Sequence, residues 1–542
     1  MSEYDIIIRN GTVYDGSGTA PYQGDVAIQG DTIAKIGDLD DAHGKTEIDA
    51  DGLAVAPGFI NMLSWSVESL IHDGRSQSEI RQGVTLEIMG EGFSMGPLSQ
   101  KMKDEWQGGI LGNTDIQYDV DWTTLREYLE NLEKRGVSTN IASFVGSATL
   151  RVHAIGYDDR PPTEAELEQM KALLRQEMED GAVGLSTALI YPPASYAKTD
   201  EILELAKIVS EYDGLYISHI RSEGTVFYEA LDELLTIARD ADVRAEIYHL
   251  KAAGKTNWHK MDEVIKRVEA ARDQGLHITA DMYTYPYSGT GLDSCIPSWA
   301  HDGGHDAFIA RLKDPETREK IKKDMQTQSD DWENMFHESG LDGILLSGFS
   351  KENMKHLTGK TLREIVEMRG TPPEETIMDL LIEDDSSIFT MYFSMSEENL
   401  RKQVTLPWLS FCSDAESQSP EGAFLKTNPH PRAYGSFARV LGKYVREEGL
   451  IPLEDAIHRL TLLPATNLKL QRRGALNTGY FADVVIFDLD NVKDYATPQE
   501  PHQYSTGMVH VFVNGIQVLE DGEHTGAKPG RVVRGPGWKG IG

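Results

Sequence analysis

Four ionisable side chains stand at the ends of segments that have the pattern of buried strands. His219 ends "LYISH", His249 follows "AEIY", Asp414 follows "WLSFCS", and Glu91 lies between two glycines after "VTLEIM". Imidazole and carboxylate groups together are ligands that zinc accepts, with one position left open for water. Two histidines on consecutive strands and a late carboxylate therefore predict a hydrolytic zinc site. A polar site that binds a ligand without a metal is the alternative.

The elements that must position these residues alternate along the middle of the chain. The predicted strands are "TNIASFVG", "AVGLSTAL", "LYISHI", "AEIYHLKA", "HITADMYTY" and "WLSFCSDA". Helical patterns lie between them, such as 163–181 and 199–214, and each ends in glycine, as helices often do. Repeated β-then-α units over roughly 400 residues favour a parallel sheet closed into a (β/α)8 TIM-type barrel, with catalytic groups at the carboxyl ends of its strands.

The two ends of the chain are rich in β patterns and differ from the middle. Turn signals follow their alternating segments at Asn10-Gly11, Gly30-Asp31 and Asn514-Gly515. We expect residues 1–57 and 475–542 to form one small β-sandwich, and residues 58–474 to form the barrel. A charged helical stretch without an obvious strand predicts an insertion at about 300–345.

The charge of the chain argues against nucleic acid and anionic membranes as partners. Its 87 acidic and 52 basic residues give a formal net charge of −35, which repels phosphate groups. No segment has the roughly 20 apolar residues that span a bilayer, and the N-terminus lacks the pattern of a signal peptide. We therefore expect a cytoplasmic protein that acts on a small molecule. Whether it forms a homo-oligomer stays open.

Only two cysteines are present, Cys295 and Cys412. A chain of this length can bury a large core without a cross-link. We interpret both residues as reduced, buried thiols rather than as a disulfide.

Several longer blocks resemble a known family. They include "APGFI" at 56–60, "RQGVT" at 81–85, "GLSTALIYPPASYAKTDE" at 184–201, "SHIRSEG" at 218–224, "HLKAAGK" at 249–255, "CSDA" at 412–415 and "HPRAYGSFARVLGKYVRE" at 430–447. With these blocks the chain is similar, nearly end to end, to the D-aminoacylase (N-acyl-D-amino-acid deacylase) branch of the amidohydrolase superfamily. The resemblance implies a metal-bearing (β/α) barrel with a small β-sandwich, and hydrolysis of non-peptide or D-configured amide bonds.

The resemblance also implies roles for single residues. His219 and His249 match histidines that hold a tightly bound zinc, together with a cysteine after the "QGVT" strand. Asp414 matches the catalytic aspartate, and Arg432 matches the arginine that binds the carboxylate of the substrate.

The sequence departs from the family in two places. The family's His-x-His after "PGFI" falls on Leu63 and Trp65, neither of which can bind a metal. The family's "GNCG" is replaced by "GEG", so Glu91 stands where the cysteine would be. Two histidines, a glutamate and a water are a known catalytic zinc arrangement. We therefore expect one zinc per chain, held by Glu91, His219 and His249, with Asp414 as general base and then as acid toward the leaving amine.

The substrate-binding residues follow from chemistry and position. Arg432 offers a two-pronged donor that matches a carboxylate. Lys251, two residues after His249, would share the face of that histidine on a strand, and would hold either a substrate carboxylate or a neighbouring acid. We expect Tyr191 and Tyr283 to line the pocket. Trp65 would either narrow the space of a second metal or stack against the substrate.

Two other functions are compatible with the sequence. A ligand-binding barrel that has lost its chemistry would explain the missing His-x-His. A metal-free lyase or isomerase would use Asp414 and Lys251 as acid and base. Metal content and turnover distinguish these functions from a zinc-dependent amidohydrolase.

Overall fold

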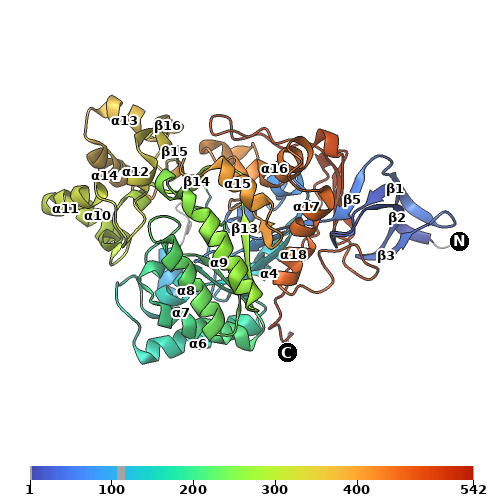
Figure 1. Ribbon diagram of the computed structural model, residues 1–542, viewed down its shortest axis with the longest axis horizontal. Coiled ribbons are helices and arrows are strands. Elements are labelled where there is room, and N and C mark those ends of the chain that lie inside the picture. The colour runs from blue at the N-terminus through green and yellow to red at the C-terminus, as the bar shows by residue number, and fades with distance from the viewer. Residues whose placement is uncertain (1–2, 107–115, 541–542) are drawn as a thin grey trace.

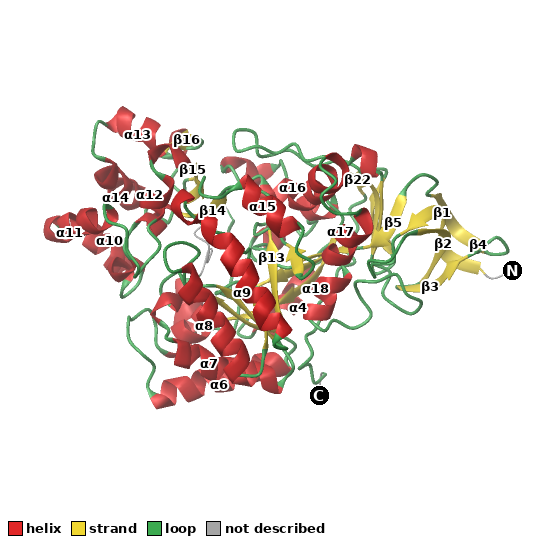
Figure 2. Cartoon of the chain, in the orientation of Figure 1, coloured by secondary structure: helices red, strands yellow, loops and turns green. Residues whose placement is uncertain are grey.

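The two ends of the molecule are built differently. The computed structural model, which describes residues 3–106 and 116–540, has the N-terminal strands at one end and the helices of residues 305–384 at the other (Figure 1). Between them, strands are surrounded by helices (Figure 2). In the described part of the chain, no helix has both the length and the apolar character needed to cross a membrane.

Strands from both chain ends form one nine-stranded sheet. Its hydrogen-bonded order is β22-β21-β20-β19-β5-β1-β2-β3, and β4 also pairs with β1. The strands are β1 (Glu3–Val13), β2 (Tyr22–Gln29), β3 (Thr32–Gly37), β4 (His43–Asp49), β5 (Ala54–Pro57), β19 (Val484–Phe487), β20 (Met508–Val513), β21 (Ile516–Glu520) and β22 (Glu523–His524). Antiparallel pairing of β19 with β5 joins the two ends of the chain.

One of the three predicted turns is wrong. Gly30-Asp31 and Asn514-Gly515 separate strands as expected, but β1 runs straight through Asn10-Gly11. Asn10 has a positive φ of 59°, and the register of β1 shifts there, so its extra residue forms a bulge. Beyond the bulge, β1 exchanges its parallel partner β4 for β5. An asparagine with left-handed backbone fits a bulge as well as a turn.

The six strands predicted in the middle of the chain are confirmed. One sheet has the parallel order β18-β13-β12-β11-β10-β9, and a second has the order β6-β7-β8. The strands are β6 (Phe59–Asn61), β7 (Val84–Met89), β8 (Asn140–Ser143), β9 (Val145–Gly146), β10 (Gly184–Ala188), β11 (Leu215–His219), β12 (Arg244–Ile247), β13 (Ile278–Met282) and β18 (Leu409–Phe411). Most are buried along their whole length, as expected for parallel strands covered by helices.

These two parallel sheets are adjacent at both of their ends. Strand β9 begins two residues after β8 ends. At the other end, the amide of Met62 donates to the carbonyl of Phe411, and Ser64 forms a parallel bridge with Ala415. The ends of β6 and β18 therefore lie side by side, which brings the segment after Asn61 next to the segment that carries Asp414.

Helices follow the parallel strands and begin and end where local chemistry favours it. Thr163 and Glu166 form a capping box at the start of α6, and Gly181, with φ of 104°, follows its end. The main helices are α4 (Leu125–Arg135), α5 (Ser147–Ala154), α6 (Glu164–Glu179), α7 (Thr199–Glu211), α8 (Phe227–Asp240), α9 (Met261–Asp273), α15 (Glu397–Val404), α16 (Arg432–Arg439), α17 (Leu453–Leu460) and α18 (Leu462–Asn467). Shorter helices are α1 (Ser69–His72), α2 (Gln77–Ile80) and α3 (Gln100–Glu105).

A helical region with its own core lies between β13 and α15. Its apolar cluster runs from Leu292 to Tyr392, so it extends beyond residue 345. It contains α10 (His305–Lys313), α11 (Pro315–Met325), α12 (Met335–Ser339), α13 (Leu362–Arg369) and α14 (Pro373–Asp384). A small sheet of order β14-β17-β15-β16 accompanies them, formed by β14 (Ser288–Gly291), β15 (Ile344–Gly348), β16 (Lys360–Thr361) and β17 (Phe389–Tyr392).

Candidate metal centre

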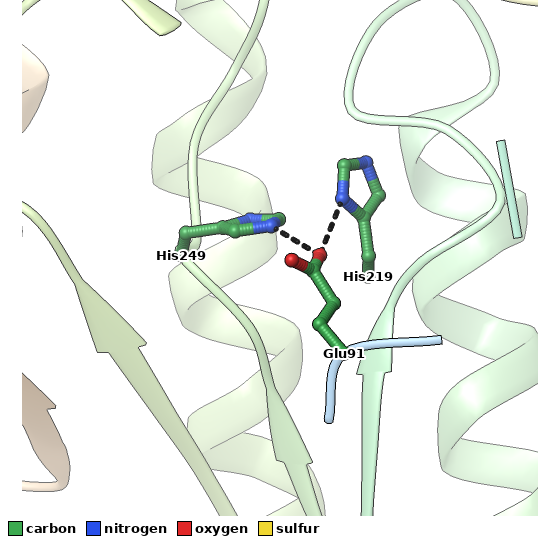
Figure 3. A group of neighbouring side chains, drawn as sticks. All are labelled: Glu91, His219 and His249. Carbon is green, nitrogen blue, oxygen red and sulfur yellow. Dashed lines mark hydrogen bonds and ion pairs between the residues drawn. The ribbon is translucent and has the colours of Figure 1, made fainter. Parts of the chain in front are cut away.

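The three predicted metal ligands come together at the carboxyl ends of three strands. Glu91 follows β7, His219 is the last residue of β11, and His249 lies two residues beyond β12. All three are buried, with 3–4% of each residue exposed. Figure 3 shows both imidazole rings directed at the same oxygen of Glu91. β11 and β12 are neighbouring parallel strands that end at the same edge of their sheet, which brings His219 and His249 together.

The loop that carries Glu91 is tight because it is made of glycines. Gly90 and Gly92 have φ values of 100° and 63°. A Cβ atom at Gly90 would lie 2.5 Å from the carbonyl oxygen of Phe144, and one at Gly92 would lie 2.6 Å from the Cβ of Ala188. Only glycine fits at these two places, and the resulting sharp turn directs Glu91 toward the histidines.

The donor set fits a zinc ion. Glu91 Oε1 lies 3.1 Å from His219 Nδ1 and 2.9 Å from His249 Nε2, and the three ligand atoms lie within 4.8 Å of one another. Ligands of a tetrahedral zinc lie about 3.3 Å apart, given metal–ligand bonds of about 2.0–2.2 Å. The two measured separations are slightly shorter than that, so a small outward movement of the side chains would accommodate the ion.

The electrostatics of the three groups are strongly coupled. Burial alone would raise the pKa of the Glu91 carboxyl, but His249 and His219 outweigh it and hold this pKa well below its usual range. Burial and Lys251 act to lower the pKa of His249, yet Glu91 and Glu223 raise it to about 10. Burial lowers the pKa of His219. This balance favours a proton on His249 in the metal-free chain, and metal binding would release it.

Three other residues contact the two histidines: Glu223, Lys251 and Asp281. Glu223 Oε1 lies 3.1 Å from His249 Nδ1, and Glu223 Oε2 lies 3.7 Å from His219 Nε2. Lys251 Nζ donates to Glu223 Oε1 at 2.6 Å and lies 2.7 Å from His249 Nδ1. The backbone amide of His249, a residue with φ of 33°, donates to Asp281 Oδ1 at 2.7 Å. Such partners fix the orientation of metal-binding rings.

Asp414 lies next to this group and contacts two other predicted site residues. The indole N–H of Trp65 donates to Asp414 Oδ1 at 3.2 Å and to Glu91 Oε2 at 3.0 Å. Arg432 Nη1 lies 2.7 Å from Asp414 Oδ2. Burial raises the pKa of the Asp414 carboxyl above its usual value, and Glu91 adds to this effect, while Arg432 and His249 act against it.

Arg432 contacts two aromatic residues, Tyr283 and His430. Its guanidinium carbon lies 4.5 Å from the ring centre of Tyr283, and its backbone amide donates to His430 Nδ1 at 3.0 Å. His430 Nε2 lies 2.9 Å from the carbonyl oxygen of Tyr287, an arrangement that leaves the ring neutral, and burial holds its pKa well below the usual value. Tyr191 packs edge-on against His219, with ring centres 5.3 Å apart.

Known proteins resemble this chain over nearly its whole length. The sequence profile of the amidohydrolase family matches residues 424–519. The chain is 31% identical to a D-aminoacylase from Alcaligenes xylosoxydans xylosoxydans over 98% of this chain and 97% of that protein. The chain belongs to the D-aminoacylase family of amidohydrolases. An N-acyl-D-aspartate deacylase from the same organism is 33% identical over 98% of this chain and 95% of its own length.

A solved structure resembles the whole chain as well. It is an N-acyl-D-glutamate deacylase from Bordetella bronchiseptica complexed with zinc and a phosphonate inhibitor that mimics the tetrahedral intermediate of the reaction. The match has a TM-score of 0.80 and 28% sequence identity, and covers 98% of this chain and 100% of that one. Membership of the D-aminoacylase family, expected from the sequence blocks, is thus confirmed.

The structure gathers the nine predicted site residues around one centre, and adds residues that the sequence did not indicate. Glu223 was missed, although it lies four residues after His219 in "SHIRSEG" and is a carboxylate in a strand-end loop. Glu333, from the helical region, was also missed; it accepts hydrogen bonds from the amide of Glu223 and, at 3.0 Å, from Ser222 Oγ. No local pattern in the sequence points to Glu333, because it comes from a segment more than a hundred residues away.

Proposed function

We propose that this amidohydrolase uses a single zinc ion to remove the acyl group of N-acyl-D-amino acids, giving a carboxylate and a free D-amino acid. The observation that carries the proposal is the cluster of Glu91, His219 and His249, with Asp414 beside it. Relatives named for D-amino acid deacylation match almost the full chain. Both histidines and the aspartate persist although two other metal-binding positions of the family hold Leu63 and Trp65.

We also infer that the parallel strands form a closed (β/α)8 barrel. Its eight strands would be β6, β7, the pair β8 and β9 counted as one, β10, β11, β12, β13 and β18. The bridge between Ser64 and Ala415 supports closure of the barrel between the first strand, β6, and the last, β18. Residues 58–474 would then form the barrel with its helical insertion, and residues 1–57 and 475–542 the β-sandwich. The change of partner along β1 favours a sheet that folds into two layers.

Glu91, His219 and His249 would hold the zinc, through one carboxylate oxygen and one nitrogen of each ring. A zinc ion there would lower the pKa of a water molecule to about 7 and polarise the amide carbonyl group. Glu223 would keep both rings in place through their remaining nitrogens.

Asp414 is the group that we assign to proton transfer. It accepts a proton from the water that attacks the amide carbon, and donates this proton to the nitrogen as the C–N bond breaks. Burial raises its pKa, which makes it a better base than an exposed aspartate and lets it return the proton. Trp65 and Arg432 each contact one of its oxygens and restrict its orientation.

Arg432 is our proposed anchor for the α-carboxylate of the substrate. It is 3% exposed, and its guanidinium group lies over Tyr283 close to Asp414, so a carboxylate bound to it would lie within reach of the reacting centre. Tyr191 and Tyr283 would form walls of the pocket. For Lys251, the contact with Glu223 favours the second of its two expected roles, that of holding a neighbouring acid.

Turnover with matched enantiomers tests the proposal. The chain, purified without a histidine tag and loaded with zinc, would be incubated with N-acetyl-D-amino acids and their L-enantiomers, and the free amine measured. We expect release from the D-enantiomers, and release at least about 100-fold slower from Asp414→Asn, which serves as a control for contaminating hydrolases. A zinc-loaded protein that releases no amine from any N-acyl amino acid would contradict the proposal and favour a binding function.

A further inference from the structure

Trp65 joins the two carboxylates of the site through one N–H group. Its Nε1 atom lies 3.0 Å from Glu91 Oε2 and 3.2 Å from Asp414 Oδ1. Glu91 Oε1 contacts the two histidines, and Asp414 Oδ2 lies 2.7 Å from Arg432 Nη1. Each carboxylate therefore offers one oxygen to the indole and has its other oxygen in a separate contact.

The backbone holds the indole in register with Asp414. The amide of Asp414 donates to the carbonyl of Leu63 at 2.9 Å, and the amide of Trp65 donates to the carbonyl of Ala415 at 3.0 Å. These two bonds form a short ladder on both sides of the bridge between Ser64 and Ala415. The half-buried ring of Trp65 also packs against the main apolar core. The position of the N–H relative to the aspartate is thus fixed by the fold as well as by its own hydrogen bonds.

The two side chains at the positions after β6, Leu63 and Trp65, offer a second cation no ligand atom. An indole N–H is only a donor and has no lone pair to offer a metal ion, and Leu63 is apolar. Two buried carboxylates that approach one another nevertheless need a positively polarised group between them, because burying unpaired charge is costly. The N–H dipole supplies this polarity without a net charge.

We propose that Trp65 is a positioning residue that takes the place of a second metal ion. Its N–H joins Glu91 to Asp414 and holds the Asp414 carboxylate toward the reacting atoms, and its ring, which offers no lone pair to a metal ion, limits the site to one divalent cation. The last part rests on the proposed function, because it takes Asp414 as the proton-transfer group. The limit to one cation does not depend on catalysis.

Zinc stoichiometry tests the limit directly. The metal-free chain, the Trp65→Phe variant and the double variant Leu63→His with Trp65→His would each be titrated with zinc, and bound ions counted after dialysis. We expect one zinc per chain in the wild type and in Trp65→Phe, and two in the double variant, which regains two imidazoles beside Glu91 and Asp414. Two zinc ions in the wild type, or one in a folded double variant, would overturn the proposal.

Kinetics of Trp65→Phe test the positioning role, and this variant keeps the ring while removing the N–H. We expect kcat to fall about 10-fold or more, the effect of losing a hydrogen bond to a charged group, with KM changed less than about 3-fold by the same reasoning. The matched control is Trp299→Phe, which removes an indole hydrogen bond of 2.9 Å to Asp324 in the helical region and should leave both constants unchanged.

The outcomes separate this inference from the proposed function. An unchanged kcat in Trp65→Phe would overturn the positioning role while leaving zinc-dependent deacylation intact. Two zinc ions in an active wild type would overturn the limit of one cation, and would also leave zinc-dependent deacylation intact. A wild type that binds no zinc would instead contradict the proposed function itself.

Discussion

The two sides of the candidate metal centre are held together by different chemistry. On the histidine side, His219 and His249 contact Glu91 and Glu223, and Lys251 completes a network of charged groups. On the tryptophan side, the segment after β6 carries Leu63 and Trp65, and the indole N–H contacts the two carboxylates.

Under the proposed function, this difference means that the site lacks the ligands of one metal position while the ligands of the other position stay organised. The histidine side keeps lone pairs directed at one point, which a cation requires. On the tryptophan side, the indole N–H alone holds the two carboxylates at their spacing. This hydrogen bonding works without a cation. The predictions below change one side at a time.

The largest effect on turnover should come from Asp414, which stands between the two sides. Asp414→Asn keeps the size and the hydrogen-bonding reach of the side chain but removes its basicity. We expect kcat to fall by about 10²–10⁴-fold, the range of general acid–base catalysis, while one zinc stays bound. Steady-state kinetics and elemental analysis on the same sample check this. A variant that keeps more than half of the wild-type kcat would remove Asp414 from proton transfer.

The histidine side is weakened selectively by Glu223→Gln. This change removes the charge that lies 3.1 Å from His249 Nδ1, and loss of such a partner typically reduces metal affinity about 10–100-fold. Competition with a chelator measures the zinc affinity. The matched control is Glu448→Gln, which removes a carboxylate paired with Arg401 away from the site; equal affinities in both variants would show that Glu223 does not support the metal ligands.

The opposite side of Asp414 is probed by Arg432. Arg432→Met should raise KM about 10-fold or more through the lost contact to the substrate carboxylate. It should also move the acidic limb of the pH profile of kcat/KM to higher pH. Arg432 acts to lower the pKa of Asp414, so its removal raises that pKa, and the basic form of Asp414 is lost at a higher pH.

Arg432→Lys serves as the matched variant, because it keeps the charge and loses the two-pronged geometry. We expect its KM to rise while its acidic limb stays near that of the wild type. If the limb moves equally in both variants, the charge of Arg432 does not act on Asp414.

The smallest effect should come from the helical region. Glu333→Gln keeps an oxygen that can accept from the amide of Glu223 and from Ser222. Burial and Glu223 raise the pKa of Glu333 to about 7, so at neutral pH the change removes only part of a charge. We expect zinc affinity to change less than about 10-fold in chelator competition at pH 7. A larger loss would place the helical region among the direct supports of the site.

The sequence located the buried parallel strands in the middle of the chain and the residues at their ends. Buried apolar runs located β10 to β13 and β18, and the parallel arrangement then brought His219, His249 and Asp414 to one edge. The Asn10-Gly11 pair was misleading, because a left-handed residue suits a bulge as well as a turn.

The contacts between side chains could not be predicted in the same way. The pairing of Lys251 with Glu223, and of Arg432 with Asp414, depends on how loops from different strands fold over the edge of the sheet. The hydrogen bonds of Trp65 depend on the ladder between residues 63–65 and 414–415, which no local pattern reveals. The sequence placed Trp65 where the resemblance implies a ligand, but it did not indicate which groups Trp65 contacts.

The central claim is that Glu91, His219 and His249 hold one zinc ion, and metal content tests it most directly. The wild type and Glu91→Ala, both without a histidine tag, would be dialysed against zinc and then against metal-free buffer. Elemental analysis would then give the number of zinc ions per chain. Our account predicts about one zinc per chain in the wild type, as for a closed set of three protein ligands and water, and loss of that zinc in the variant. Zinc retained by Glu91→Ala, or its absence from the wild type, would contradict the account.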